Sequence, residues 1–337
     1  MIKDLTIQTV AEASRWDEFI ALSPQGSVFS STRWLDAAAE AQGGEPVYLA
    51  VLKNGQIVAG VSFLSIVRGG MRKATSPAVT PYGGILFRPP PGKRASEAES
   101  FNLACAELIR EWLERRYHTV FLVHAPALND VRPFTWSGWS TPVRYTYLLD
   151  IADTDALWDV FERRVRTVIR NAESSLMLSG PVDVETFAVL YERIYGDRGR
   201  SLPYQTRLIE RLASRVLRED FAEMRTVLND AGEVISAMIL VYDDRTVYSW
   251  ISGSLPEENA SGAFSLLFWD AIKRHSGKRP RLDMIGANID SIAFFKKGFG
   301  GTLTPYYVTE WYSSGLRKAA ARAYTWVRRI MRRQSRW

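Results

Sequence analysis

Two stretches of the chain repeat one pattern, and this repeat constrains the fold more than any other feature. Residues 47–64 hold two segments of strand composition around an Asn-Gly turn at Asn54. Residues 224–240 hold two more around a polar turn that contains Gly232. A short polar glycine turn between apolar, β-branched segments is typical of a β-hairpin. One such hairpin in each half of the chain predicts two domains of related fold.

The elements expected around each hairpin also correspond. In the second half, apolar spacing predicts helices at 157–176, 204–218, 262–275 and 289–297 and strands at 246–251, 281–285 and 304–312. In the first half it predicts a central helix at 101–116 and a strand at 119–123. This order resembles that of acetyltransferase-type folds. We therefore expect an α+β protein with two GNAT-like domains in tandem, residues 1–150 and 151–312, and a cleft between them.

The composition is that of a globular protein with more than one core. The chain has 337 residues, 46% hydrophobic and 24% charged, which exceeds the usual size of a single core. The single cysteine, Cys105, lies in an apolar helical segment with no disulfide partner, which favours a buried structural role. The N-terminus lacks the basic-then-apolar pattern of a secretory signal, and no apolar run approaches about 20 residues. We expect a cytoplasmic protein.

The positive charge is concentrated at the C-terminus. Residues 315–337 contain eight Lys or Arg and no acid, so the rest of the chain carries −2 of the net charge of +6. The basic pI gives no reason to expect a nucleic-acid-binding body. Apolar residues recur in this tail every three to four positions, which predicts a basic amphipathic helix over 313–337. Such a helix either lies on an anionic membrane surface, at the inner face of the membrane, or docks on the body of the protein.

Several motifs resemble those of the FemAB-like family of peptidoglycan-bridge aminoacyltransferases. Residues 291–301, followed by 305–307, are similar to the family's C-terminal signature, a helix ending Phe-Lys-x-x-Phe-Gly before the last strand. Residues 28–35 are similar to its N-terminal Phe-x-Ser-x-x-Trp motif, residues 166–172 to a basic helix, and residues 82–84 to a first-domain turn. The resemblance extends over about residues 27–312.

The resemblance implies two fused acetyltransferase-like domains that transfer an amino acid from aminoacyl-tRNA to an amine, such as one on a cell-wall precursor. It implies no metal and no bound cofactor, only a co-substrate. Residues 259–263 lack the glycine-rich loop whose amides hold the pyrophosphate of coenzyme A. Aminoacyl-tRNA is therefore the expected donor. Two alternatives remain: an N-acyltransferase in envelope or polysaccharide assembly that uses acyl-CoA or an acyl carrier, and a non-catalytic binding module at a membrane surface.

The family signature and the strand ends supply the candidate catalytic residues. Lys296 falls in the C-terminal signature at a helix end, where an exposed ammonium could stabilise the oxyanion or leaving group. Asp283 ends a strand and could hold the acceptor ammonium or act as a base. Phe295, beside Lys296, is a candidate for lining the acceptor site.

Further candidates for substrate binding come from loops and strand ends. They are Arg198, Arg200 and Tyr204 in a glycine-rich loop, Tyr248 and Trp250 on one face of a strand, and Tyr82 and His124 in the first half. The two arginines suit a phosphate of the donor because a guanidinium binds phosphate with two hydrogen bonds. A histidine at a strand end can titrate near neutral pH. The aromatics on the strand are equally compatible with core packing.

Overall fold

A computed structural model describes residues 4–89, 92, 94–196, 204–315 and 319. The described residues divide into two compact units: unit 1 holds those up to Arg144 and those after Thr304, and unit 2 holds Tyr145–Thr304. The chain passes from one unit to the other within two strands, β7 (Val143–Asp150) and β13 (Thr302–Tyr312). Most of the predicted C-terminal helix lies outside the described residues. Within these residues, no helix combines the length and apolarity that crossing a bilayer requires.

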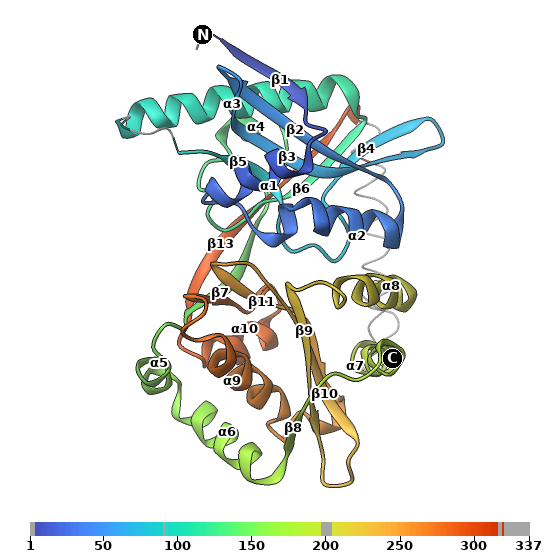
Figure 1. The fold of residues 1–337 in the computed structure, drawn as a ribbon, viewed down its shortest axis with the longest axis vertical. Helices are drawn as coiled ribbons and strands as arrows, with labels where there is room; N and C mark the ends of the chain where they lie inside the picture. The colour runs from blue at the N-terminus through green and yellow to red at the C-terminus, as the bar shows by residue number, and fades with distance from the viewer. Residues whose placement is uncertain (1–3, 90–91, 93, 197–203, 316–318, 320–337) are drawn as a thin grey trace. The chain divides into compact units, whose positions relative to one another are not determined.

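Unit 1 is a mixed sheet with helices on both faces (Figure 1). Before β7, its elements are β1 (Leu5–Thr9), α1 (Ala13–Leu22), η1 (Val28–Ser30), α2 (Thr32–Gln42), β2 (Glu45–Lys53), β3 (Gln56–Arg68), β4 (Met71–Thr75), β5 (Gly84–Phe87), α3 (Ala95–Arg116), β6 (Thr119–Val123) and α4 (Arg132–Trp136). The strand order is β1-β2-β3-β4-β6-β13, with β5 paired to β3. Only β4 and β6 are parallel, because α3 carries the chain across between them.

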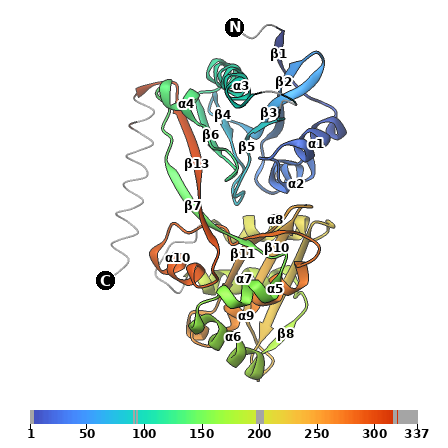
Figure 2. The ribbon, with the colours of Figure 1, turned by 90° about the vertical axis from the view of Figure 1, so that its left-hand side faces the viewer.

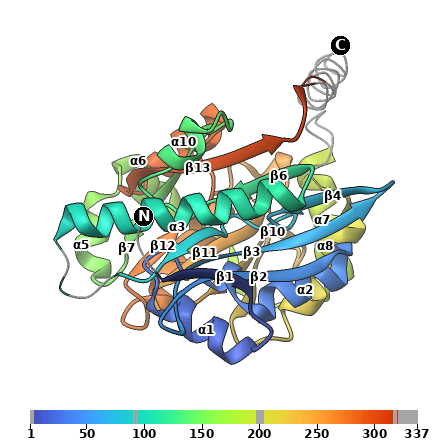
Figure 3. The same ribbon diagram turned by 90° about the horizontal axis from the view of Figure 1, so that it is seen from above.

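Each face of the unit 1 sheet packs on its own helices (Figure 3). Helix α3 covers one face, where Cys105 and Ile109 join a buried cluster with Phe63. Helix α1 covers the other face, where Trp16 and Phe19 join a second cluster. Cys105 is buried, as predicted, and burial raises the pKa of its thiol to about 12.

Unit 2 contains a second mixed sheet in the order β7-β12-β11-β10-β9-β8. After β7 its elements are α5 (Thr154–Val160), α6 (Arg163–Ser175), β8 (Met177–Ser179), α7 (Val184–Gly196), α8 (Thr206–Val216), β9 (Ala222–Leu228), β10 (Val234–Tyr242), β11 (Thr246–Ser254), η2 (Pro256–Glu258), α9 (Ala263–His275), β12 (Arg281–Asp283) and α10 (Asp290–Lys297). Helix α9 carries the chain from β11 to its parallel neighbour β12. Helices α7 and α9 both pack on β10 and β11.

The two units share one order of elements, which confirms the predicted α+β fold. The predicted hairpins are β2–β3 and β9–β10. In each unit a connection that contains a helix joins two parallel strands: β5 and α3 lie between β4 and β6 in unit 1, and η2 and α9 lie between β11 and β12 in unit 2. The sheet then ends in an antiparallel strand, which is β13 beside β6 in unit 1 (Figure 2) and β7 beside β12 in unit 2.

Each unit therefore takes its final strand from the other half of the sequence. As a result, the unit boundaries differ from the predicted 1–150 and 151–312. Strand β13 lies at the end of the predicted second domain, yet from Pro305 it belongs to unit 1. Strand β7 lies at the end of the predicted first domain, yet from Tyr145 it belongs to unit 2. Composition identifies a strand but does not say which sheet it joins.

The helix predicted over 157–176 is two helices, α5 and α6. Phe161 has extended backbone angles between them and is buried against Trp158, Trp269 and Phe299. The guanidinium of Arg166 donates to the last carbonyls of α5, those of Trp158 and Asp159. The apolar spacing continues across the break because both helices face the same core.

Candidate functional site

The carboxyl end of β12 is where several predicted residues meet. The parallel pairing of β11 with β12 ends at Tyr248 opposite Asp283. The segment after β12 continues alongside β7. The Met284 amide donates to the Tyr147 carbonyl at 3.0 Å, and the Ala287 amide donates to the Tyr145 carbonyl at 2.7 Å. Strand β11 continues to Ser254. The segment after β12 thus diverges from β11, and in mixed sheets such divergence at strand carboxyl ends is where ligands bind.

Lys296 holds the bend that follows β12. Its ammonium donates to three consecutive carbonyls, those of Met284, Ile285 and Gly286, the last at 2.8 Å. Ile285 and Gly286 both have positive φ, +45° and +76°, so the chain turns sharply there. An ammonium has three protons to donate, and all three are used in this bend.

The structure corrects the expected exposure of Lys296. Its side chain is 6% exposed, not solvated at a helix end. Burial lowers its pKa to about 8, while the nearby Asp283 carboxylate acts in the opposite direction. Lys296 therefore acts on its surroundings through the carbonyls that it orients, and its catalytic role remains a prediction.

Asp283 and Tyr248 form a buried polar cluster with Lys296. One Asp283 oxygen accepts from the Thr146 hydroxyl at 2.6 Å and from the Ile285 amide at 2.8 Å. The Tyr248 hydroxyl donates to Asp243 at 3.2 Å. The pKa of Tyr248 lies well above its usual value because the phenol is buried and lies near the carboxylates of Asp243 and Asp283. Asp283 is only 1% exposed, so its carboxylate is shielded from solvent.

The remaining candidate residues of unit 2 are not part of this polar cluster. Phe295 stacks on Phe264 of α9 at a centroid distance of 5.2 Å and so packs α10 against α9. Trp250 is buried on β11. Tyr204 is 40% exposed and exchanges backbone hydrogen bonds with the Tyr191 hydroxyl before α8. The predicted phosphate ligands Arg198 and Arg200 lie outside the described residues.

In unit 1, the family-like motifs converge in one aromatic cluster. Phe29 meets Trp34 edge-to-face at 4.7 Å and Tyr82 at 6.3 Å. Tyr82 in turn meets Tyr306 of β13 at 5.3 Å. The Trp34 indole donates to the Thr80 hydroxyl at 2.9 Å. Segments far apart in sequence thus share one core, and Tyr82, 1% exposed, is part of it.

His124 fixes the turn that follows Tyr82. Its Nδ1 accepts from the Ile85 amide at 3.2 Å, so its Nε2 carries the proton and donates to the Thr309 hydroxyl at 3.0 Å. The ring is fully buried, and burial lowers its pKa to about 3. The imidazole is therefore neutral at physiological pH and holds β5, β6 and β13 together. Both ring nitrogens are engaged, which leaves neither for a ligand.

Helix α6 covers the start of α9, where a donor pyrophosphate could have bound. Gly262 precedes α9 with a φ of +83°, and a Cβ there would lie 2.8 Å from Val168 and 3.1 Å from Ala172. The Ala263 amide is within 3.3 Å of the Ser261 hydroxyl, which itself donates to the Glu258 carbonyl. Amides at a helix N-terminus bind phosphate when they face open space. Here α6 packs directly against Gly262, the residue that precedes the helix, so the space next to that glycine is filled.

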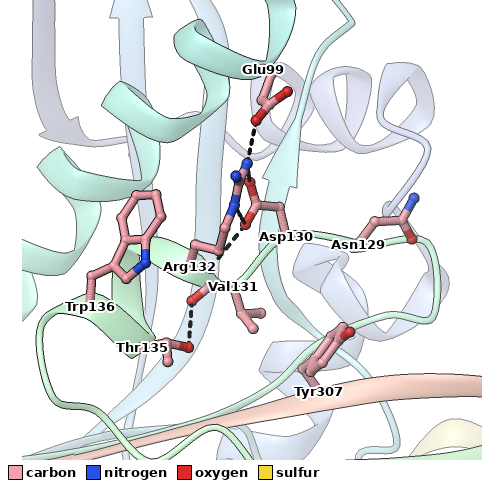
Figure 4. A pocket seen from close by; sticks show the side chains of 8 residues that line it. All are labelled: Glu99, Asn129, Asp130, Val131, Arg132, Thr135, Trp136 and Tyr307. Carbon is pink, nitrogen blue, oxygen red and sulfur yellow. Dashed lines mark hydrogen bonds and ion pairs between the residues drawn. The ribbon is translucent and has the colours of Figure 1, made fainter. Parts of the chain in front are cut away.

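Two cavities lie away from all the predicted residues. One, of about 470 Å³ in unit 1, is lined by Glu99, Asn129, Asp130, Val131, Arg132, Thr135, Trp136 and Tyr307. Figure 4 shows the Arg132 guanidinium between Asp130 and Glu99, and the hydrogen bonds from Arg132 to Asp130 lower the pKa of that carboxyl. The other, of about 500 Å³, lies in unit 2 beside the β9–β10 turn. Among the described residues, no group of His, Cys, Asp or Glu is arranged to hold a metal ion.

Two contacts near the candidate site were not predicted from the sequence. Thr146 of β7 binds Asp283 from the other half of the sequence, and no local pattern indicates that pairing. Val168 and Ala172 of α6 face Gly262. A glycine at the start of a predicted helix was the only signal in the sequence for such close packing.

Comparisons with known proteins agree with this architecture. Residues 161–291 match the model of the acetyltransferase (GNAT) domain family. Among curated proteins, no sequence matches significantly. The chain is similar in structure to FemX, with 14% identity and a TM-score of 0.64 over 90% of this chain and 96% of FemX.

Two further solved structures have the same fold. A tandem GNAT protein from the clavulanic acid biosynthesis pathway is 13% identical, with a TM-score of 0.52 over 92% of this chain and 99% of that one. The C-terminal domain of a putative lysylphosphatidylglycerol synthetase from Agrobacterium fabrum is 10% identical, with a TM-score of 0.53 over 92% and 94%. The chain therefore has the fold of FemX and of this tandem GNAT protein, as its motifs predicted, and residues 161–291 match the acetyltransferase (GNAT) domain family.

Proposed function

We propose that this acyltransferase moves an aminoacyl group from aminoacyl-tRNA to an amine, such as one on a cell-envelope precursor. The observation that carries the choice of donor is the close packing of α6 against Gly262, which crowds the start of the helix whose amides would otherwise hold a pyrophosphate. An ester-linked aminoacyl group needs no such anchor, because the tRNA supplies its own contacts. The similarity to FemX supports the same class of reaction.

The proposed chemistry is aminolysis of an ester. The acceptor amine attacks the ester carbonyl, an amide bond forms, and the ribose hydroxyl leaves with the proton that the amine gives up. The reacting groups would lie where the segment after β12 diverges from β11, with Asp283 near the acceptor ammonium. Lys296 would set the geometry of the Met284–Gly286 bend and place positive charge behind it.

The acyl-CoA alternative has one observation in its favour. The matching family model is that of acetyltransferases, and the match includes the start of α9. Coenzyme A could then bind along β11 without using the amides near Gly262. The binding of coenzyme A and of aminoacyl-tRNA must therefore be compared directly.

Donor binding tests the proposal. We expect charged tRNA to bind the full chain, and an excess of coenzyme A neither to displace it nor to slow hydrogen exchange in the first turn of α9. The physical reason is that Val168 and Ala172 occupy the space next to Gly262. The measurements are filter binding with radiolabelled aminoacyl-tRNA and hydrogen-exchange mass spectrometry with coenzyme A. Strong protection of residues 262–266 by coenzyme A would contradict the proposal and favour the acyl-CoA enzyme.

A further inference from the structure

The hairpin of β3 and β4 projects from the sheet of unit 1 (Figure 3). Arg68 pairs with Met71 across a two-residue turn, Gly69 and Gly70, which have φ of +53° and +74°. A Cβ at either glycine would meet no atom within 4 Å, so the tip is surrounded by open space. Every residue from Val67 to Arg72 is exposed. The tip is therefore accessible to a large partner.

Two large apolar side chains lie at this tip. Val67 is 62% exposed and Met71 is 52% exposed. Val67 shares one face of the hairpin with its cross-strand partner Arg72, and Met71 shares the other face with Arg68. Each face thus combines one apolar side chain with one cation. Because both apolar side chains are more than half exposed, they add little to the core of unit 1.

The segment of sequence that contains the hairpin carries charge of one sign only. Between residues 46 and 96 the sequence contains no Asp or Glu but seven basic residues, which are Lys53, Arg68, Arg72, Lys73, Arg88, Lys93 and Arg94. Arg72 lies 5.4 Å from the Tyr117 ring. Lys73, next along β4, is within electrostatic reach of Glu310 in β13 as well as of Arg68. Arg68 and Arg72 are therefore the cations nearest the tip, the first next to the glycine turn and the second over the Tyr117 ring.

We propose that this hairpin tip docks on an anionic membrane surface, with Val67 and Met71 in the interfacial layer and Arg68 and Arg72 against lipid phosphates. RNA offers the same phosphates but gains nothing from exposed aliphatic side chains, whereas a bilayer buries them. Docking is shallow, because the backbone at Gly69 and Gly70 needs water or headgroups as hydrogen-bond partners. This contact is independent of the donor and brings the acyltransferase to lipid-borne acceptors.

A fluorophore at the tip separates hairpin docking from membrane binding by another part of the chain. Cys105 is buried, so Met71→Cys introduces one accessible thiol for an environment-sensitive nitrobenzoxadiazole label on the full chain. We expect its fluorescence to rise with phosphatidylcholine–phosphatidylglycerol vesicles and not with phosphatidylcholine alone. Leu22→Cys on α1, whose native side chain is 53% exposed, provides the matched control and is expected to show no rise.

Unlabelled variants then measure the contribution of each group in vesicle co-sedimentation. Val67→Ser with Met71→Ser is expected to weaken binding by about tenfold, and Arg68→Gln by about fivefold. Leu22→Ser and Arg207→Gln, exposed residues elsewhere, are the controls and should leave binding unchanged. The proposal is overturned if the Met71 label does not respond while the protein sediments with anionic vesicles. It is also overturned if the label responds only to added RNA.

Discussion

Replacement of Lys296 by methionine is expected to lower the free energy of unfolding by about 3 kcal/mol. Methionine fills much the same space but donates no hydrogen bond, so the carbonyls of Met284, Ile285 and Gly286 are left without their buried partner. A buried acceptor that loses its donor costs about 1–3 kcal/mol, and relaxation of the bend recovers part of that cost. The measurement is urea unfolding of both proteins at neutral pH.

The adjacent lysine provides the control. Lys297 lies on the same helix and is exposed, so Lys297→Met is expected to change stability by less than about 0.5 kcal/mol. Equal stability of the Lys296 and Lys297 variants would show that the three hydrogen bonds do not hold the bend.

The same pair of proteins also predicts a pH dependence. The pKa of Lys296 is about 8 in the folded chain, against 10.5 for an exposed lysine. Between these values the unfolded chain binds the proton and the folded chain does not, so stability rises with pH in this window. We expect the stability of the wild type, relative to Lys296→Met, to rise by about 2 kcal/mol from roughly pH 7.5 to 9.5. A flat difference would place the folded pKa near its usual value.

Gly84→Ala is expected to destabilise unit 1 by about 3 kcal/mol or more. Gly84 has a φ of +69°, and a Cβ there would lie 2.3 Å from Nδ1 of His124. The alanine would have to displace the imidazole that bonds Ile85 and Thr309, and three strands would lose their shared contact. Thermal unfolding followed by circular dichroism measures the loss.

The neighbouring glycine distinguishes this clash from a general effect of substitution in the turn. At Gly83 the φ is not positive, and an added Cβ would be 3.7 Å from its nearest neighbour, the Ser76 hydroxyl. Gly83→Ala is therefore expected to be tolerated. Comparable losses from both substitutions would argue against the steric role of His124.

The sequence predicted what depends on local pattern. Both hairpins follow from apolar segments around glycine turns, and β6 was predicted with its observed bounds, Thr119–Val123. The exchange of β7 and β13 could not be predicted, because strand pairing is decided by contacts between distant segments. The break at Phe161 was missed because a buried aromatic fits both a helix and the short turn between α5 and α6.

For the candidate site, too, local pattern identified residues but did not predict their contacts or burial. Lys296, Asp283 and Tyr248 were singled out from one motif and two strands, and the structure places all three at the carboxyl end of β12. Their burial was not predictable, since a lysine at a helix end is normally solvated. His124 was chosen as a strand-end residue that could titrate, but its ring is inside the core of unit 1. Charge and spacing identify a residue, whereas its exposure depends on the packed fold.

The central claim is that unit 2 transfers an aminoacyl group from tRNA at the carboxyl end of β12. Its most direct test is the rate of amide formation from radiolabelled aminoacyl-tRNA, or from radiolabelled acetyl-CoA, to a wall-precursor peptide with a free amine. We expect product from charged tRNA only, and a loss of at least about tenfold in Asp283→Asn, which keeps the oxygen that binds Thr146 and Ile285 but removes the charge. Product from acetyl-CoA alone, or full activity in a folded Asp283→Asn protein, would contradict it.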